Sequence, residues 1–269
     1  MQADKIIEHI AGWLEEYCCK AGLRGFVVGV SGGIDSAVAS TLCAKSGREV
    51  LALNMPIYQP RDQQTLAERH VQWLEERFPL VTGMTIDLTP AFQSLETVLP
   101  EDIQDGLSMA NTRSRLRMLT LYAFANNRCM LVAGTGNKIE DFGVGFFTKY
   151  GDGAVDIAPI ADLMKSEVYA LGAELGILED IRAATPTDGL WADSRSDEEQ
   201  LGASYDELEW AMRFEVSKGN EDGLTDRQRQ VLAVYRRLNR CNRHKMVPIP
   251  VAEVPDHLRR PAESSEERL

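Results

Sequence analysis

A glycine-rich loop lies between an apolar segment and a helical segment near the start of this chain. Residues 25–30 read Gly-Phe-Val-Val-Gly-Val, residues 31–36 read Ser-Gly-Gly-Ile-Asp-Ser, and residues 37–45 favour a helix. This order predicts a buried strand, a tight turn and a helix. Glycines let a phosphate approach the backbone closely, and the N–H groups and dipole at a helix N-terminus attract it. We therefore expect this loop to bind phosphate groups.

Polar side chains of the loop suit the same chemistry. Ser31 and Ser36 offer hydroxyl groups, and Asp35 is a hard oxygen ligand of the kind that a phosphate-bound Mg²⁺ prefers. The loop lacks the lysine of the Walker pattern, and it does not follow the G-x-G-x-x-G pattern. The alternative interpretation is an ordinary strand–helix turn that is rich in small residues.

Apolar and helical segments alternate along the first half of the chain, which is typical of a parallel sheet whose strands are joined by helices. From the periodicity we expect strands over residues 25–30, 50–55, 82–88 and 130–134, and helices over residues 3–20, 37–46, 61–77, 90–98 and 107–127. These elements predict an α/β fold with a doubly wound, open parallel sheet flanked by helices.

The second half of the chain is less regular. We expect a loop with a short strand over 146–160, helices over 163–175, 204–216 and 224–240, a mobile loop over 185–203, and a flexible tail over 255–269. No internal repeat or linker is visible, so we expect a single domain over residues 1–269. Ligands of an open parallel sheet bind beyond the carboxyl ends of its strands. The loops 31–36 and 135–141, which follow two strands, should therefore face one cleft.

Charge and composition argue against several classes of protein. The chain has 269 residues and a formal net charge of −12, whereas a nucleic-acid-binding protein usually has a basic face. There is no stretch of ~18 apolar residues and no signal-peptide pattern. The five cysteines form no C-x-x-C pair and are interpreted as buried thiols in a reducing compartment. We therefore expect a cytoplasmic protein with neither a nucleic-acid nor a membrane partner.

A series of further motifs follows the glycine-rich loop in a defined order. They are Gly-Thr-Gly-Asn-Lys at 134–138, Gly-Phe-Phe-Thr-Lys-Tyr-Gly-Asp-Gly at 145–153, Asp-Ile-Ala-Pro-Ile at 156–160, Pro-Thr-Asp-Gly-Leu-Trp at 186–191, the run from Asp-Glu at 197–198 through Leu-Gly at 201–202 to Ser-Tyr-Asp at 204–206, and His-Lys at 244–245. The loop itself resembles the Ser-Gly-Gly-x-Asp-Ser loop of the ATP pyrophosphatases. Together, the loop and the motifs resemble the NAD⁺ synthetase family over residues 5–250.

The resemblance implies a two-step ligase reaction that uses ATP and Mg²⁺. The nicotinate carboxylate of deamido-NAD⁺ attacks the α-phosphate of ATP, which forms an acyl adenylate and releases pyrophosphate. Ammonia then attacks the adenylate carbonyl, which gives NAD⁺ and AMP. Residues 1–24, which precede the first predicted strand, are too few for the fused amidase domain of glutamine-dependent members, so we expect the ammonia-dependent form.

Other interpretations stay open beside this one. The chain would also suit another ATP pyrophosphatase that adenylates a different substrate, or a non-catalytic module that binds ATP in regulation. Members of the family form dimers, and the predicted helices 3–20 and 107–127 have more apolar surface than packing within one subunit requires. We therefore expect a homodimer.

The resemblance also assigns residues to the site. The positions that match ATP-binding residues are Gly29, Val30, Ser31, Gly32, Gly33, Ile34, Asp35, Ser36, Thr135, Lys165 and Thr187. The positions that match residues binding deamido-NAD⁺ are Arg115, Lys149, Asp156, His244 and Lys245.

The metal ligands and the catalytic groups are assigned on the same basis. Asp35 and Glu140 match the Mg²⁺ ligands, although counting back from the motif at 145–153 gives Asp141 in place of Glu140. Asp35 and Lys165 are also assigned catalytic roles. Asp152 lies in a glycine-flanked loop, and we hypothesise that it orients or deprotonates the incoming ammonia.

Overall fold

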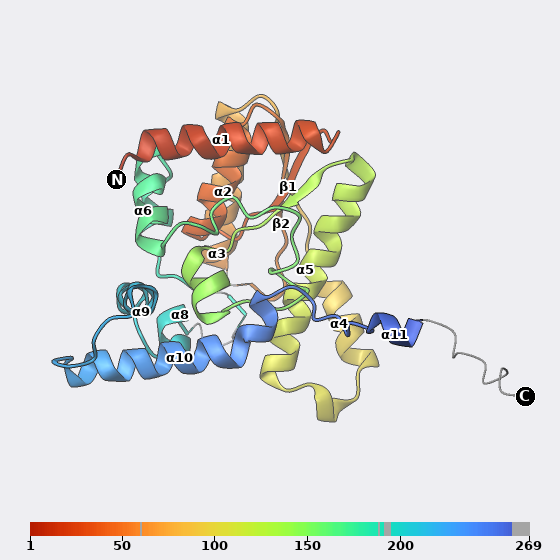
Figure 1. The fold of residues 1–269 in the computed structure, drawn as a ribbon. Helices are drawn as coiled ribbons and strands as arrows, with labels where there is room; N and C mark the ends of the chain where they lie inside the picture. Colours follow the sequence, from red (N-terminus) through yellow and green to blue (C-terminus); the bar gives the residue numbers. More distant parts are fainter. Residues whose placement is uncertain (60, 188, 191–194, 260–269) are drawn as a thin grey trace, which may run out of the picture.

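The computed structural model describes residues 1–59, 61–187, 189–190 and 195–259. Its centre is a sheet of four parallel strands in the order β3-β2-β1-β4 (Figure 1). The strands are β1 (Gly25–Gly29), β2 (Glu49–Asn54), β3 (Val81–Thr85) and β4 (Leu131–Ala133). The chain runs from β1 outward to β3 and then returns to the other side of β1, so the strand order reverses between β1 and β4. The predicted open parallel sheet is confirmed.

Helices cover both faces of this sheet, as a doubly wound fold requires. They are α1 (Ala3–Lys20), α2 (Ile34–Lys45), α3 (Arg61–Arg77), α4 (Thr89–Val98), α5 (Gly106–Arg128), α6 (Lys165–Glu174) and α7 (Glu179–Ala183). Phe26 and Val28 of β1 pack on one side with α1, α2, α3, α6 and α7, whereas Val27 packs on the other side with α4 and α5. Because both faces are covered, β1 reads as a continuous apolar run.

Local signals explain where the long helix α5 begins and ends. The carboxylate of Asp105 accepts hydrogen bonds from the backbone N–H groups of Leu107 and Ser108, each over 3.0 Å. At the other end, Cys129 adopts the left-handed conformation, with φ of 54°, and the chain turns back into β4. The helix therefore spans the sheet and presents its N-terminal half to the carboxyl ends of the strands.

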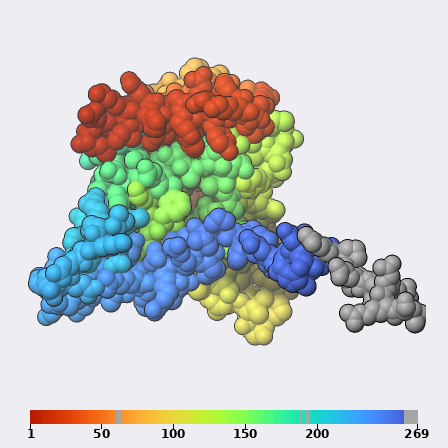
Figure 2. Space-filling view, viewed as in Figure 1, coloured from red at the N-terminus to blue at the C-terminus, as the bar shows by residue number. Residues whose placement is uncertain are grey.

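A smaller helical assembly packs at the end of the sheet opposite α1 (Figure 1). It consists of the π-helical segment η2 (Ile139–Val144), α8 (Asp197–Leu201), α9 (Tyr205–Ser217) and α10 (Asp226–Met246). Its own buried cluster includes Ile139, Leu208 and Leu232. In Figure 2, α10 in blue crosses the lower part of the face on view, and α1 in red covers the top. Because η2 follows β4 directly, this assembly lies beside the carboxyl ends of the strands.

Two loop predictions need correction. The short strand expected within 146–160 is a single isolated bridge between Ala133 and Ile157. A side chain replaces part of the ladder there, because the Asp156 carboxylate accepts a hydrogen bond from a backbone N–H of β4. The loop expected over 185–203 contains α8, whose start is capped by a Ser–Glu capping box.

The end of the chain also differs from the prediction. Helix α10 continues well past residue 240, so His244 and Lys245 lie in its last turn. Asparagine side chains of these turns donate hydrogen bonds to the carbonyl groups of η2, which hold the helix beside the site. Within the tail predicted to be flexible, residues 256–259 form a short helix, α11. Residues 260–269 lie outside the described part of the chain.

Two of the five cysteines match the prediction that the thiols are buried. Cys18 and Cys43 are buried free thiols, as expected, whereas Cys19, Cys129 and Cys241 are exposed. Within the described ranges, none of the helices has the length and apolar character that crossing a bilayer demands. A single domain over the whole chain stays a prediction.

Candidate active site

A cavity of about 960 Å³ opens at the carboxyl ends of β1, β2 and β4. Its walls come from the loops after these strands, from α5 and from the end of α10. The strand order reverses at this edge, where ligands of open α/β sheets bind. The site residues predicted from the sequence that line the cavity are Gly29–Ser36, Arg115, Thr135, Glu140, Lys149, Asp152, Lys165, Thr187, His244 and Lys245. Asp156 is the predicted site residue that lies outside this lining.

The glycine-rich loop forms the floor of the cavity at the start of α2. Gly32 has φ of +87°, a conformation that disfavours any side chain. The backbone N–H of Ser31 donates to Oγ of Ser36 over 3.2 Å, and that hydroxyl donates to the carbonyl of Gly33 over 2.9 Å. The two serines thus close the loop, and the N-terminus of α2 faces the cavity with its dipole and backbone donors.

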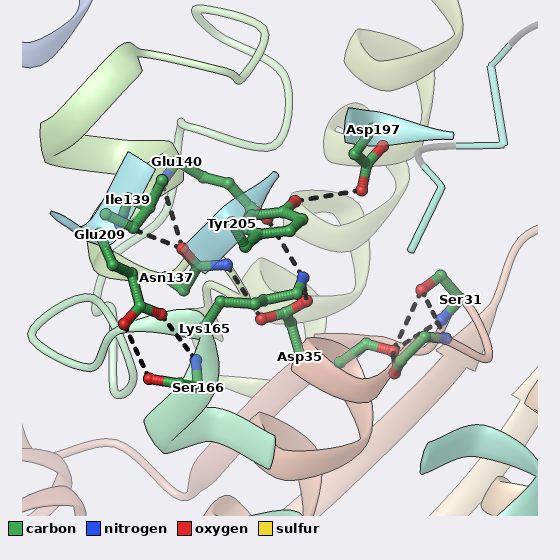
Figure 3. Close-up of polar contacts among 12 residues, drawn as sticks. Ser31, Asp35, Asn137, Ile139, Glu140, Lys165, Ser166, Asp197, Tyr205 and Glu209 are labelled. Atoms are coloured by element: carbon green, nitrogen blue, oxygen red, sulfur yellow. Dashed lines mark hydrogen bonds and ion pairs between the residues drawn. The ribbon is translucent and has the colours of Figure 1, made fainter. Parts of the chain in front are cut away.

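A buried lysine joins two carboxylates above this loop (Figure 3). Lys165 begins α6, and its Nζ contacts Oδ2 of Asp35 and lies 3.3 Å from Oε1 of Glu140. Only 3% of the lysine side chain is exposed. Burial alone would lower the pKa of Lys165, but the two carboxylates overcome it and raise that pKa. Burial raises the pKa of Glu140, and Lys165 opposes that shift. The two carboxylates therefore favour the protonated form of Lys165 beside the glycine-rich loop.

A fully buried asparagine connects the two carboxylates through the backbone. Nδ2 of Asn137 donates to Oδ1 of Asp35 over 3.1 Å. Its Oδ1 accepts from the backbone N–H groups of Ile139 and Glu140 over 3.1 and 3.2 Å, at the start of η2. One side chain therefore sets the separation between the loop after β1 and the loop after β4.

The neighbouring acid, Asp141, has a different environment. Its carboxylate packs against the backbone of Gly136, where an added Cβ would lie 2.2 Å from Oδ1 of Asp141. Burial raises the pKa of Asp141 to about 8, and the nearby charge of Glu140 adds to this effect. The Asp141 carboxylate fills the space beside Gly136, and any side chain at position 136 would have to displace it.

The acidic groups near Lys165 fit a magnesium ion that ATP would help to hold. Mg²⁺ prefers oxygen ligands and is usually bound by one or two carboxylates together with substrate phosphates. Asp35 and Glu140 supply two such carboxylates, and both contact the ammonium group of Lys165. Among the described residues there is no group of three or more His, Cys, Asp or Glu side chains that could form a metal site. These two carboxylates therefore fit a Mg²⁺ ion that the phosphates of ATP would also bind, and they do not form a complete metal site by themselves.

Basic side chains form the opposite wall, where α5, the loop 145–153 and α10 meet. Nε of Arg115 donates to the carbonyl of Lys149 over 3.2 Å, and Nζ of Lys149 donates to the carbonyl of His244 over 2.7 Å. Nζ of Lys245 donates to the carbonyl of Phe147 over 2.7 Å. Burial lowers the pKa of Lys245. These contacts bring together four of the five positions expected to bind deamido-NAD⁺.

Two further acids mainly organise the backbone. Oδ1 of Asp152 accepts from Oγ of Ser114 over 2.6 Å and from the backbone N–H of Thr148 over 2.9 Å, which ties the loop 145–153 to α5. Asp156 accepts from the hydroxyl of Tyr122 over 3.0 Å and from a backbone N–H of β4 over 2.8 Å. Asp152 lines the cavity, whereas Asp156 supports the strand beneath it.

Sequence reasoning missed several side chains of the site. Arg117 lines the cavity, and its Nε donates to the carbonyl of Met55 over 2.9 Å. Its position two residues after Arg115 was the available signal. Asn137 and Tyr205 lie within motifs that carry the resemblance, at 134–138 and 204–206, but neither was assigned a role. Tyr205 is the first residue of α9, inside the Ser–Glu capping box that starts this helix.

Comparison with known proteins places this site in a family. The family model for NAD synthase matches residues 6–248. The NH3-dependent NAD⁺ synthetase of Methanosarcina mazei is 36% identical over 268 residues, which cover 94% of this chain and 100% of that protein.

Solved structures agree in fold. An NMN synthetase from Francisella tularensis has a TM-score of 0.82 at 29% identity and covers 95% of this chain and 99% of its own. An NH3-dependent NAD synthetase from Campylobacter jejuni has a TM-score of 0.77 at 26% identity, with coverage of 94% and 100%. Since the matches span the glycine-rich loop, the loop after β4 and the end of α10 alike, the chain belongs to the NAD synthase family.

Proposed function

We propose that this chain converts deamido-NAD⁺ to NAD⁺ with ATP and ammonia, through an acyl adenylate, releasing AMP and pyrophosphate. The observation that supports it most is the buried Lys165, which lies between Asp35 and Glu140 beside a glycine-rich loop. A phosphate-binding loop and a basic wall face each other across one cavity of about 960 Å³. That arrangement suits a reaction in which two anionic substrates must be brought together.

The first step needs neutralisation of charge, because a carboxylate attacks a phosphate. The N-terminus of α2 and the loop 31–36 bind the ATP phosphates, and Lys165 stabilises negative charge on them. Asp35 and Glu140 would hold Mg²⁺, which neutralises the phosphates and polarises the attacked phosphorus. We favour Glu140 over Asp141 for this role, since Glu140 faces Lys165 and Asp141 packs against Gly136.

The basic wall positions the dinucleotide. Arg115, Lys149 and Lys245 line the cavity and would neutralise the phosphates of deamido-NAD⁺. His244, next to Lys245 on α10, also lines it, and its carbonyl accepts a hydrogen bond from Lys149. Asp156 is exposed, does not line the cavity and accepts hydrogen bonds from Tyr122 and from the backbone of β4, so we propose that it acts by holding the strand in place. Thr135 and Thr187 line the part of the cavity proposed to hold ATP.

Asp152 is the proposed group for the second step. Its carboxylate lines the cavity while it accepts hydrogen bonds from Ser114 and Thr148. Those bonds fix its orientation, which suits a group that orients ammonia. We expect Asp152→Asn to lower turnover with ammonia by about 10²-fold, as for the loss of a positioned acid or base. Asp162→Asn, a change at an exposed aspartate, is the matched control. Unchanged turnover of the Asp152→Asn variant across pH would refute the role of Asp152 in orienting ammonia.

The deciding experiment measures NAD⁺, AMP and pyrophosphate formed from deamido-NAD⁺, ATP and Mg²⁺, with ammonium or glutamine in parallel. NAD⁺ formed with ammonium and not with glutamine supports the proposal. AMP and pyrophosphate formed without NAD⁺ would support adenylation by this chain and would indicate an acceptor substrate other than deamido-NAD⁺. No cleavage of ATP under any condition would favour a nucleotide-binding module and refute the ligase.

Nicotinate mononucleotide should be tested as a second acceptor substrate in the same experiment. The Francisella protein, with its TM-score of 0.82, is an NMN synthetase. Nicotinate mononucleotide carries the same carboxylate as deamido-NAD⁺ and lacks the adenylyl half. Equal amounts of the two acids should therefore be offered in competition. Preference for deamido-NAD⁺ supports the proposal, and preference for the mononucleotide makes this chain an NMN-forming enzyme.

We also propose that the protein is a cytoplasmic homodimer. Trp13 and Tyr17 of α1 are 39% and 42% exposed, and Leu119 of α5 is 67% exposed. Apolar surface of this kind on two long helices suits burial against a second copy. Light scattering coupled to gel filtration gives the mass directly, and a monomer at micromolar concentration would refute the dimer.

A further inference from the structure

Helix α9 lies behind the active-site cavity and directs two buried polar side chains toward it. Tyr205 and Glu209 are one turn apart on the same face of the helix, and they are 5% and 3% exposed. Neither residue lines the cavity. Buried polar groups are costly unless they are hydrogen-bonded, so the partners of these two side chains indicate what they are for.

Tyr205 contacts two of the three members of the buried ion cluster, Glu140 and Lys165 (Figure 3). Its hydroxyl donates to Oε1 of Glu140 over 2.6 Å and lies 3.2 Å from Oδ2 of Asp197. Its ring faces the lysine, with Nζ of Lys165 4.5 Å from the ring centre. The phenol therefore orients the carboxylate, and the ring face stabilises the ammonium group.

Glu209 holds the helix from which Lys165 projects. Its two carboxylate oxygens accept from the backbone N–H and from Oγ of Ser166, each over 2.8 Å. Ser166 is the residue directly after Lys165, at the first turn of α6. A carboxylate at this end of a helix also interacts favourably with the helix dipole. Glu209 thus fixes the position from which the lysine side chain starts.

The start of α9 is in turn tied to the segment that carries Thr187. The backbone N–H of Tyr205 donates to Oε1 of Glu198 over 2.9 Å. One residue earlier in α8, the N–H of Asp197 donates to the carbonyl of Pro186 over 3.1 Å. A continuous path of hydrogen bonds thus runs from the residue before Thr187 through Asp197 to Tyr205 and Glu140.

We infer that Tyr205 and Glu209 are positioning residues for the proposed reaction: Tyr205 orients Glu140 for the metal, and Glu209 orients Lys165 for the ATP phosphates. The inference rests on the proposed function, because it takes Asp35 and Glu140 as the carboxylates that share a metal with ATP. Partners of metal-binding carboxylates typically change metal affinity or activity by about 10–100-fold when they are removed.

The test compares Tyr205→Phe and Glu209→Gln with wild type, and Tyr235→Phe is the matched control. Tyr235 is a buried tyrosine of the same apolar cluster, and its hydroxyl makes no hydrogen bond within the described residues. Binding of Mn²⁺ is followed by electron paramagnetic resonance with a non-hydrolysable ATP analogue present. Binding of the analogue itself is measured by calorimetry, and kcat and KM for ATP are measured separately.

We expect Tyr205→Phe to weaken Mn²⁺ binding by at least about tenfold and to lower kcat, with a smaller change in KM for ATP. Glu209→Gln keeps one acceptor and loses the charge, so we expect it to weaken binding of the analogue by about tenfold. Tyr235→Phe should match wild type in every readout. Unchanged Mn²⁺ affinity in Tyr205→Phe would overturn the role of Tyr205, and unchanged analogue affinity in Glu209→Gln would overturn that of Glu209.

The same experiments distinguish a failure of the positioning roles from a failure of folding or of the proposed function. Melting curves show whether each variant unfolds cooperatively at a temperature near that of wild type. If Tyr205→Phe does not fold, Tyr205→Met replaces it, because its flexible side chain fills the space and also lacks the hydroxyl that donates to Glu140. Unchanged Mn²⁺ affinity in that variant overturns the role of Tyr205. Wild type that binds Mn²⁺ with the analogue but forms no NAD⁺ refutes the proposed function and leaves the positioning test valid. Wild type that binds no Mn²⁺ overturns the positioning of Glu140 for a metal.

Discussion

The glycine-rich loop and the buried ion cluster lie side by side in one cavity, but they are built in opposite ways. The loop is closed by hydrogen bonds between Ser31 and Ser36, which are five residues apart. The cluster joins Asp35 to Lys165 across 130 positions and Glu140 to Tyr205 across 65. The loop is therefore a local structure that its own sequence specifies. The cluster exists only when η2, α6 and α9 have packed together.

This difference bears on stability as well as on geometry. The loop is partly exposed: Ser36 is buried, whereas Ser31 is exposed and has water as an alternative partner. The ammonium of Lys165 and the carboxylate of Glu140 have little access to water, so each depends on its partners within the protein. Changes in the cluster should therefore affect both folding and activity, whereas changes in local structure should cost less.

The largest expected effect comes from removing the central cation. Lys165→Met leaves two buried carboxylates without their shared positive charge, which typically costs about 3–5 kcal/mol of unfolding free energy. We also expect activity to fall by about 10²–10³-fold, because a charge stabilising the transition state is lost. Denaturant unfolding and steady-state kinetics measure the two effects.

The control for this change is Lys138→Met. Lys138 pairs with Asp162, whose side chain is 97% exposed, over 2.7 Å. Surface pairs of this kind contribute at most about 1 kcal/mol. Equal losses of stability in the two variants would mean that burial of the cluster does not determine its energy, and the contrast between the two regions would fail.

A smaller effect is expected in the turn after β4. Gly136→Ala places a methyl group against Asp141, five residues away, which must move to make room. Overpacking of this kind costs about 1–3 kcal/mol. Gly12→Ala is the matched change in α1, where nothing lies within 4 Å of the added Cβ. It should stabilise the helix by about 0.5–1 kcal/mol, and a loss of stability there would contradict the geometry of α1.

The last expected effect depends on pH and concerns a buried residue beside the sheet, away from the ion cluster. His70 of α3 is fully buried, lies 3.0 Å from Oγ of Ser40 and stacks on Trp73. Burial lowers the pKa of His70 to about 4, so the folded protein keeps the imidazole neutral. The pKa in the folded state is below that of the unfolded chain, near 6.5. Its contribution is therefore complete above pH ~6.5 and is lost as pH falls toward ~4.

This loss amounts to at most about 1.4 kcal/mol per pH unit within the window. His70→Phe cannot be protonated, so its melting temperature should fall less between pH 6.5 and 4 than that of wild type. Parallel thermal melts across this range measure the difference. Identical slopes for the two proteins would show that His70 is protonated in the folded state.

Several features of the molecule follow from the sequence because their causes are local. The strand–loop–helix unit at 25–45 needs an apolar run, two glycines and a helix-forming segment, and all three lie within a few turns of chain. The alternation of apolar and helical segments predicted a parallel sheet, whereas the strand order came from the structure. The resemblance of the motifs to a known family also identified the walls of the cavity, including Arg115, Lys149 and Lys245.

Other features could be decided only by tertiary contacts. The sequence left Glu140 and Asp141 open as alternatives, and the two side chains became distinct only when one faced Lys165 and the other packed against Gly136. The extension of α10 past residue 240 depends on hydrogen bonds to η2. Asp156 looked like a cavity residue and proved to be part of the support for β4.

What the sequence determined by itself was therefore the chemistry that short-range backbone geometry can create: a phosphate-binding loop, a parallel sheet and the order of the motifs. What only the tertiary structure decided was which charges meet. The buried Lys165 meets carboxylates that are 25 and 130 residues away in the sequence, and the ring of a tyrosine that belongs to another helix, α9. Electrostatic interactions in a low-dielectric interior depend on distance in space, and that distance is set by packing rather than by position along the chain.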